Sequence, residues 1–582
     1  MSHTASGSDG FDRILQARLR RRQILRAAIG AGMLVPGLGT LLAACGGGSE
    51  EPTSPAGGDG GQASATTPSP SGSPDSSDGG GEGKRGGIAR IVTTANPASW
   101  DLTKSTWATW QGISYMYDRL LTFNEAEELQ PGLAVSWEFS DDGLEYLLNL
   151  REGVTFHDGE PFNAEAVKFN IQRHIDQPDS AFYATYEPVD RVEVIDEHTV
   201  KIVLKEIEVF FPYTGLAQWG ALQLSPKAYG ETGETYSEHP VGTGPFKFES
   251  YEPGSSIKFV RNDDYWGGAP LLDGIEVRII PESSVQLIEM EAGTVDYIQA
   301  QPKDVELLQS KGMVIESTIT PGAQFISLNV SKEPTSELAV RKAIALAIDR
   351  DTIIDEVLFG YAEKSRAGVN SQSPFYHDDI PMIEYDPERA GAILDEAGWV
   401  MGSNGIRQRD GKPLFVNILS AEYTNWGLLN QIIQEQLKVI GIDSQIQTLE
   451  WNAYLDQWRE NQGDWHVTFH SQGSITAASA PIQASWAPSN FWTITQIDDA
   501  TTPELQELAE RLEAINQDIL SNPDPEARKA LAREAQMLFQ ENQLTVWLWH
   551  AATISAIQPR LKGYWFSHAG RVLELDKAWI EE

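Results

Sequence analysis

The side chains of this chain that could carry out chemistry are histidines, carboxylates, one cysteine and many aromatic rings. The sequence contains no Gly-x-Ser-x-Gly turn, no His-Glu-x-x-His pair and no Walker loop. His466 and His470 are four residues apart in a segment that is typical of a strand. On a strand, that spacing separates them by about 13 Å, which is too far to share a metal ion. The sequence therefore predicts no metal, no cofactor and no catalytic residue.

Aromatic rings are the plentiful binding groups. The chain has 17 Trp, 17 Tyr and 20 Phe. Flat rings beside amide and hydroxyl groups suit sugar rings, and they also suit the apolar side chains of a peptide. A pair of catalytic carboxylates, as in a glycosidase, stays open because Asp and Glu number 83 and no pattern marks two of them.

One segment of the chain shows how such rings would be positioned. Residues 416–420 are typical of a strand, 424–440 of a helix, and 442–449 of a second strand. A unit of this size predicts two parallel strands joined by a right-handed crossover. Ligands bind beyond the carboxyl ends of parallel strands, so we expect a site near residues 420–426.

Elsewhere strands and helices are mixed, which favours a mixed α/β fold. Alternating apolar residues predict a hairpin over residues 190–205, and a similar pair of strands flanks residues 141–143. Further expected helices begin after Asn163, span 337–348, run from Asp386 to Gly398, and cover 503–519 and 525–541. An apolar strand is expected at 544–548.

The first 44 residues have the composition of an export signal. Arginines at 20–22 precede an apolar stretch, 27–44, that glycine and proline interrupt and that is less hydrophobic than a membrane span. Residues 21–26 resemble the twin-arginine motif, which would carry the protein across the membrane already folded. Residues 42–45 resemble the lipobox of bacterial lipoproteins. We expect a signal peptide over 1–44 and lipidation of Cys45.

A tether and an acidic body follow. Residues 45–85 contain almost only Gly, Ser, Pro, Thr, Ala, Asp and Glu, which predicts a disordered linker spanning roughly 35 Å. The whole chain has a net charge of −39, and residues 1–44 carry +4, so the remainder carries −43. A surface this acidic repels nucleic acid and favours solubility, and we expect no nucleic-acid partner.

Several phrases of the body resemble the family 5 extracellular solute-binding proteins, which are the dipeptide, oligopeptide and nickel receptors of ABC importers. The longest runs from Gly153 to Val167 and includes Thr-Phe-His-Asp-Gly-Glu-Pro-Phe-Asn-Ala-Glu. The others follow in the family's order and together span about 87–580: Pro-Val-Gly-Thr-Gly-Pro-Phe at 240–246, Arg-Asn-Asp-Asp-Tyr-Trp at 261–266, Asn329, 340–344, 347–350, 385–388, 397–399, 440–442 and 450–451.

The resemblance implies a periplasmic-binding-protein-like type II clamshell, whose two lobes enclose the ligand. Mapped onto this chain, the first lobe covers 86–323 plus 546–582 and includes an extra third domain at about 126–239. The second lobe covers 324–545. Two hinge segments would lie near 322–329 and 542–549.

The resemblance also indicates where ligand contacts would lie. Trp451 matches a family contact position, and further aromatic residues fall near the expected cleft. Some peptide receptors of the family carry a phrase like Trp-x-x-Asp whose acidic residue contacts the ligand's ammonium group, and here Gln472 and a residue near Ile475 take those places. This departure weakens the case for a zwitterionic peptide. The expected ligand-binding residues are Trp107, Trp110, Tyr423, Trp426, Trp451, Gln472, Trp486 and Trp492.

We therefore expect a monomeric receptor, not an enzyme, that delivers an oligosaccharide or an oligopeptide to an ABC permease by two-lobe closure. It would be extracytoplasmic, lipid-anchored at the outer face of the cell membrane or in the periplasm. Three alternatives stay open: a metal chelate such as nickel as ligand, a secreted lipid-anchored enzyme such as a glycoside hydrolase, and a ligand sensor for a signalling partner.

Overall fold

Long-range strand pairing organises the molecule. A computed structural model describes residues 84–97, 99–104, 110–124, 127–422, 426–471, 495–500, 502–567 and 572–581. Within these residues the main sheet has the order β18-β17-β19-β12-β20-β11-β1-β10-β9-β8, with β13 beside β20. In that order the strands are Asp443–Leu449, Phe415–Ala421, Val467–Ser471, Val314–Leu328, Thr545–Ile557, Tyr297–Gln299, Ile88–Thr93, Gly274–Ile279, Ser256–Arg261 and Phe246–Glu252, and β13 is Ala362–Lys364.

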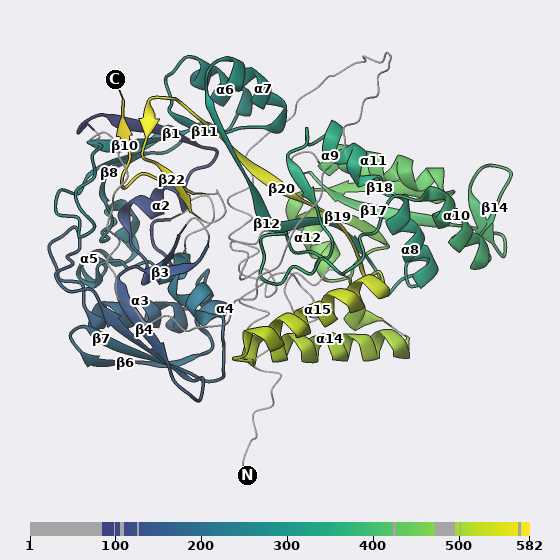
Figure 1. Cartoon of the computed structure of the whole chain (residues 1–582), viewed down its shortest axis with the longest axis horizontal. Coiled ribbons are helices and arrows are strands. Elements are labelled where there is room, and N and C mark those ends of the chain that lie inside the picture. Colours follow the sequence, from purple (N-terminus) through teal and green to yellow (C-terminus); the bar gives the residue numbers. More distant parts are fainter. Residues whose placement is uncertain are drawn as a thin grey trace, which may run out of the picture.

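The two longest strands, β12 and β20, run side by side from one body of the molecule into the other (Figure 1). They are antiparallel, and their register shifts between Ile319 and Ala323 and again between Gln324 and Phe325. These irregularities fall at the start of the expected hinge 322–329. The strand predicted at 544–548 was too short, because β20 continues to Ile557, and its added residues pair with both β12 and β11.

The second lobe is the body built around a hydrophobic core whose described residues lie almost entirely between Ala323 and Trp549. Here the predicted strand–helix–strand unit is confirmed: β17 and β18 are parallel, and α11 (Trp426–Val439) connects them. Gly441 has φ of +83°, which ends the helix as expected. The other helices of this lobe are α8 Leu338–Ala347, α9 Arg350–Glu356, α10 Pro387–Glu396, α12 Trp451–Arg459, α14 Pro503–Ser521 and α15 Pro525–Glu541.

The first lobe combines the other half of the main sheet with a smaller antiparallel sheet. The smaller sheet has the order β4-β5-β7-β6, so both hairpins expected there are confirmed. Helix α3 (Ala164–Asp176) covers this sheet, and the Asn163 side chain accepts a hydrogen bond from the Ala166 amide at 3.1 Å, which caps the helix as predicted. The four strands are Ala134–Phe139, Glu145–Leu150, Thr199–Leu204 and Val189–Asp196.

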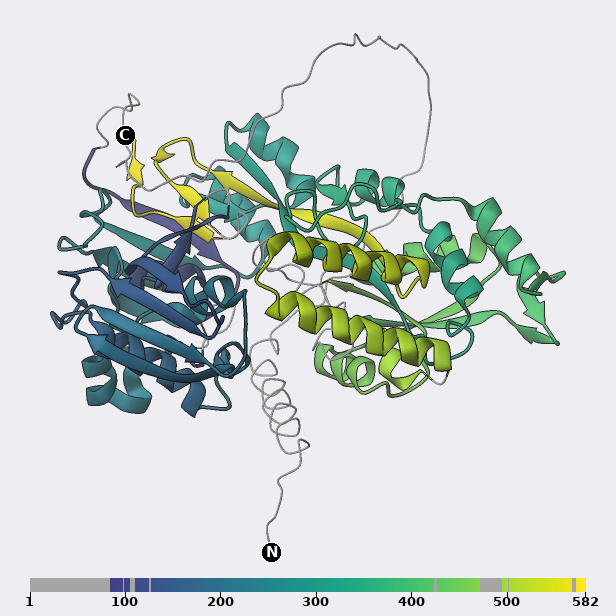
Figure 2. The same ribbon diagram turned by 60° about the horizontal axis from the view of Figure 1, so that its bottom comes forward.

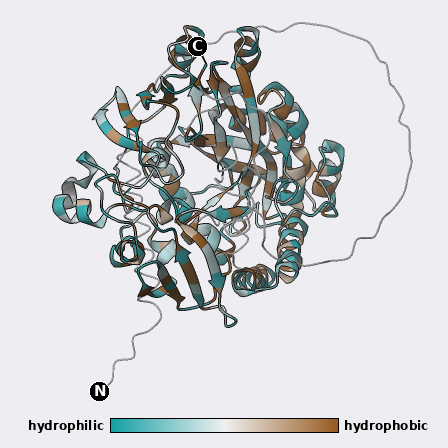
Figure 3. Ribbon diagram, turned by 60° about the vertical axis from the view of Figure 1, so that its left-hand side comes forward, coloured by the Kyte–Doolittle hydropathy of each residue, from teal (hydrophilic) through white to brown (hydrophobic). Residues whose placement is uncertain are grey.

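Residues from the C-terminal end of the chain complete this first lobe. Its central core joins residues from 89–297 with residues from 557–578. Hydrophobic residues concentrate on the strands, and hydrophilic residues colour most of the outer helices and loops (Figure 3).

The remaining helices are α2 Trp110–Met116, α4 Tyr183–Tyr186, α5 Pro226–Thr232, α6 Ser283–Glu291 and α7 Val305–Ser310. The remaining paired strands are Leu121–Phe123, Leu129–Pro131, Val400–Met401, Arg407–Arg409, Lys412–Pro413, Leu561–Lys562, Trp565–Ser567, Val572–Glu574 and Trp579–Ile580.

Candidate functional site

Three neighbouring parallel strands of the second lobe end at the same edge. β17 is parallel to β18, with Ala421 opposite Leu449, and parallel to β19, with Leu419 opposite Thr468. The segments that leave these strands begin at 422, 450 and 472. Because ligands bind beyond the carboxyl ends of parallel strands, this edge is the candidate binding site of the second lobe.

Two of the expected tryptophans meet there. Trp426 is the first residue of α11 and Trp451 is the first residue of α12, so each begins the helix that follows its strand. Their rings are edge to face with centroids 5.7 Å apart. Trp426 is only 3% exposed, whereas Trp451 is partly exposed. Trp426 therefore supports the ring of Trp451, and Trp451 has the surface that a ligand could touch.

Three further residues, which sequence reasoning missed, complete an aromatic wall behind Trp451. Tyr454 stacks on Trp451 and on Trp458, with centroids 5.7 and 6.0 Å apart. His470 of β19 lies 4.3 Å from the Trp458 ring. The signal was present in the sequence, since Trp451, Tyr454 and Trp458 recur at the spacing of one helix face.

The rings of the wall are themselves uncharged, and the nearby Arg459 guanidinium lies 5.5 Å from the centre of the Trp458 ring. Burial lowers the pKa of His470 to about 3, and the positive charge of Arg459 acts in the same direction. The Tyr454 hydroxyl lies 3.1 Å from Thr468 Oγ1 and 3.3 Å from His470 Nδ1. Buried rings held by such contacts are rigid and carry no charge near pH 7, so they give Trp451 a fixed, uncharged backing.

His466, the other histidine of this segment, has a different role. The Asn417 amide donates to its Nδ1 at 3.0 Å, which leaves Nε2 as the protonated nitrogen that donates to the Glu333 carbonyl at 2.8 Å. Both ring nitrogens are thus engaged, and burial lowers its pKa. The segment 467–471 is a strand, as expected. Among the residues that the structure describes, no group of three or more His, Cys, Asp and Glu could hold a metal ion.

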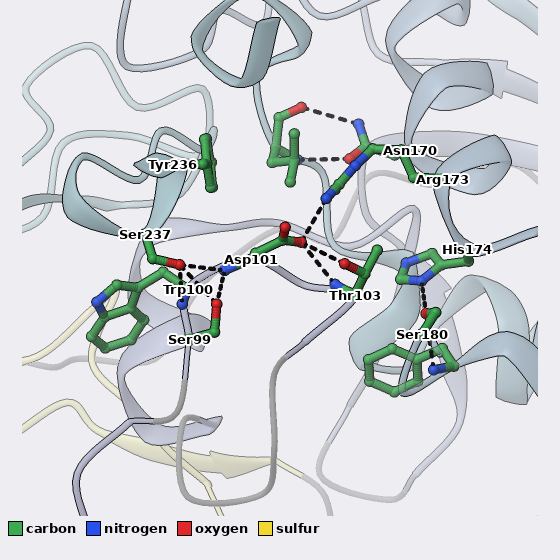
Figure 4. Close-up of polar contacts among 12 residues, drawn as sticks. Ser99, Trp100, Asp101, Thr103, Asn170, Arg173, His174, Ser180, Tyr236 and Ser237 are labelled. Carbon is green, nitrogen blue, oxygen red and sulfur yellow. Dashed lines mark hydrogen bonds and ion pairs between the residues drawn. The ribbon is translucent and has the colours of Figure 1, made fainter. Parts of the chain in front are cut away.

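On the first lobe, a buried polar network holds the segment that leads to the remaining expected rings. Arg173 of α3 contacts Asp101 at 2.5 Å, and both side chains are 7% exposed (Figure 4). Asp101 also accepts hydrogen bonds from the Thr103 amide at 3.0 Å and hydroxyl at 2.9 Å. The Arg173 guanidinium lies 4.0 Å from the centre of the Tyr229 ring. These contacts fix residues 99–104 against α3, directly before the segment that carries Trp107.

The electrostatics of this network favour the ion pair. Burial by itself would raise the pKa of Asp101, but the Arg173 charge and the hydrogen bonds from Arg173 and Thr103 hold it below its usual range. Next to the pair, the Ser237 hydroxyl contacts Ser99 Oγ at 2.7 Å and accepts from the Trp100 amide. On the other side, His174 Nδ1 lies 2.8 Å from Ser180 Oγ.

The expected site residues are therefore only partly placed. Trp426 and Trp451 are brought together, and Trp110 begins α2 in the first lobe. The role of each in binding stays a prediction. Outside the described residues lie Trp107, Tyr423, Gln472, Trp486, Trp492 and Cys45.

Comparison with protein families identifies the class. The model of the bacterial extracellular solute-binding proteins, family 5 Middle, matches residues 128–492, which is more than half of the chain. The chain belongs to this family. Its members are extracytoplasmic receptors of ABC importers, and they are binding proteins, not enzymes. The expected recognition is thus confirmed.

Relatives with different ligands share this fold. Heme-binding protein A of Haemophilus influenzae is 27% identical over 78% of this chain and 86% of its own length. Di/tripeptide-binding protein 2 of Pseudomonas aeruginosa is 28% identical over 81% of this chain and 91% of its own length. Oligopeptide-binding protein AppA of Bacillus subtilis is 27% identical over 88% of this chain and 95% of its own length.

Solved structures confirm the two-lobed clamshell. NikA from Brucella suis, in complex with Fe(III)-EDTA, has a TM-score of 0.75 and 25% identity, covering 84% of this chain and all of that protein. HbpA2 from Haemophilus parasuis has a TM-score of 0.72 and 23% identity, covering 85% of this chain and all of that protein, which shows the fold alone. Among the described helices, none combines the length and apolar character needed to cross a membrane.

Proposed function

We propose that this receptor captures short peptides outside the cytoplasm, as a monomer, and delivers them to an ABC permease by closing its two lobes. The observation that carries the proposal is the neutral aromatic wall around Trp451, at the shared carboxyl edge of three parallel strands. Relatives named for di-, tri- and oligopeptides support this ligand class. Trp451, the partly exposed ring of the wall, would pack against apolar side chains of the peptide without demanding one sequence.

The amino end of the peptide has no carboxylate partner at the place where the family resemblance would put one. Gln472 stands where some peptide receptors of the family place the Trp of a Trp-x-x-Asp phrase, and no Asp follows near Ile475. A buried ammonium group without a carboxylate partner is costly. We therefore propose recognition through the peptide's backbone and side chains, with its ammonium group left in solvent.

Thermal-shift screening of the purified protein tests the ligand class. The probes are short peptides with free and with acetylated amino ends, maltotriose, hemin, and nickel with histidine. A peptide at 100 times its Kd should stabilise the folded state by about 2.7 kcal/mol. Acetylation should change Kd by less than tenfold. A shift with maltotriose alone would assign the protein to oligosaccharides, and a shift with hemin or nickel alone would assign those ligands.

A pair of variants tests the site. Trp451→Ala should abolish the peptide-induced shift, because it removes the partly exposed face of the wall. Trp137→Ala is the matched control: this ring is also partly buried, but it lies in the smaller sheet of the first lobe. Trp137→Ala should lower the melting temperature and leave the peptide-induced shift intact. An unchanged shift in Trp451→Ala would remove Trp451 from the site.

We further propose the anchoring and the division of the chain that the sequence predicts. Residues 1–44 would be a twin-arginine signal, Cys45 the lipid-modified terminus, and residues up to 85 the tether. The lobes would divide at 323/324 and 545/546, close to the irregular β12–β20 pairing. Cys45→Ala should move the protein from the membrane fraction to the soluble fraction while peptide binding persists. Retention of Cys45→Ala in membranes would contradict the lipid anchor.

A further inference from the structure

The two lobes touch at a second place, away from the β12–β20 strands that join them. The segment 208–216 of the first lobe reaches the second lobe, where the Val209 amide donates to the Leu520 carbonyl at 3.0 Å. Leu520 lies near the end of α14. Figures 1 and 2 show the α14–α15 end lying beside the first lobe.

Phe210 is buried in the core of the opposite lobe. It is 3% exposed, and the other described residues buried in that core lie between Ala323 and Trp549. Its ring centroid is 6.2 Å from that of Phe375, and the Arg528 guanidinium lies 5.5 Å from the ring centre. Phe210 is therefore a knob from the first lobe seated in a socket of the second.

Contacts within the second lobe hold the socket. Gln536 of α15 donates to the Phe375 carbonyl at 2.9 Å, which fixes the Phe375 loop to the helix. Arg528 donates to the Asn522 carbonyl at 2.7 Å. Both hydrogen bonds lie within the second lobe, so these two contacts of the socket do not involve the first lobe.

Contacts within the first lobe hold the knob in the same way. The Phe210 amide donates to Glu208 Oε1 at 3.1 Å, and the Tyr146 hydroxyl donates to the Glu208 carbonyl at 3.1 Å. A π-helical turn, Pro212–Leu216, follows directly, and Tyr213 in it stacks on Phe123. A knob and a socket that are both preformed lose little conformational entropy when they meet.

We propose that Phe210 is an interlobe latch and that the arrangement of the lobes in this structure, in which Phe210 is seated in the second lobe, is the closed form that it stabilises. Opening the clamshell by rotation about β12 and β20 separates Val209 and Phe210 from α14 and α15. The ring of Phe210 and its socket then become exposed to water, and the Leu520 carbonyl loses its partner. The latch thus biases the protein toward closure before any ligand is bound, and the ligand adds its own contacts to that bias.

Small-angle X-ray scattering of the full chain without ligand tests the latch. Wild type should scatter as the closed form, and Phe210→Ala should lower the ratio of closed to open protein at least tenfold, which corresponds to about 1.4 kcal/mol. Phe156→Ala is the matched control, because Phe156 belongs to the same lobe and is 2% exposed, but it packs in a core made of first-lobe residues alone. It should scatter like wild type.

A variant in the second lobe distinguishes loss of the latch from a general loss of stability. Phe375→Ala removes the socket side, and a Phe210→Ala/Phe375→Ala double variant should open no further than either single variant, because one contact is lost in each. Phe210→Leu should retain most of the closure. Identical scattering of wild type and Phe210→Ala, or additive opening in the double variant, would overturn the proposal. Since no ligand is added, these results do not depend on the peptide assignment.

Discussion

The buried Asp101–Arg173 pair gives a prediction whose magnitude follows from its surroundings. Both side chains are 7% exposed and 2.5 Å apart, so removing one partner leaves an uncompensated charge in the interior. Such losses cost about 3–5 kcal/mol of the free energy of unfolding. For Arg173→Met we expect about 3 kcal/mol, because Asp101 keeps both hydrogen bonds from Thr103. Urea denaturation at pH 7 measures this loss.

The double variant Asp101→Asn/Arg173→Met tests whether the unpaired buried charge causes the loss of stability in the single variants. With both charges removed, no buried ion is left without a partner, so the double variant should be more stable than either single variant. Losses that simply add would instead mean that Asp101 and Arg173 act independently.

The pH dependence of the Arg173→Met variant provides a second check. In wild type the pKa of Asp101 is below its ordinary value, so the pair's stabilisation is present above about pH 3.9, the unfolded pKa, and is lost as pH falls through the lower folded pKa. Without Arg173, burial raises the pKa of Asp101, so its carboxyl is protonated in mild acid. The difference in unfolding free energy between variant and wild type should therefore shrink as pH falls from 7 to 4. A constant difference would contradict this account.

Two other perturbations have equally definite outcomes. A Cβ at Gly242 would lie 2.0 Å from the Met116 carbonyl oxygen, so Gly242→Ala should destabilise the protein by about 3 kcal/mol, whereas Gly230→Ala, in open space on α5, should change stability by less than about 1 kcal/mol in a urea titration. Acid should also destabilise the fold, because four histidines, three of them buried and one partly exposed, have folded pKa values of about 3 to 4, below the unfolded value of 6.5. Between pH 7 and pH 5 each of them therefore lowers the free energy of unfolding by about 2 kcal/mol. Burial raises the pKa values of Glu208 and Glu574 to about 7, so between pH 7 and pH 5 each of these two groups raises the free energy of unfolding by about 2 kcal/mol. Together they offset roughly half of the loss caused by the histidines. A melting temperature that rises between pH 7 and pH 5 would contradict this balance. The four histidines are His157, His174, His470 and His550.

Local features of the fold were accessible from the sequence because short-range physics determines them. A capping side chain such as Asn163 and a stop such as Gly398 act within one helical turn, so both helix ends were predicted correctly. The parallel β17–β18 pair followed from one strand–helix–strand segment. The length of β20 did not, because its second half is specified by pairing with β11 and β12, more than 200 residues away in the sequence.

In the candidate site, too, the sequence predicted local features and missed those that depend on distant parts of the chain. The sequence placed Trp426 and Trp451 near the edge of the sheet, but it could not tell that one ring is buried and the other partly exposed, since exposure depends on what packs from other elements. Asp101 and Arg173 are 72 residues apart, and nothing in either neighbourhood marks them as partners. Phe210 sits in an apolar run that fits its own domain equally well, and only the fold shows that it enters the other lobe.

The position of β20 has a consequence for how this protein is made. β20 lies between β12 and β11, and residues 557–578 complete the core of the first lobe. Domains that are contiguous in sequence can fold while the ribosome is still adding residues, N-terminal part first. Here the first lobe begins near residue 86 but lacks β20 and residues 557–578 until after the whole second lobe has been synthesised. Its folding must therefore wait until these residues have left the ribosome, and removal of residues 553–582 should leave this lobe unable to fold although the whole second lobe, 324–545, is present.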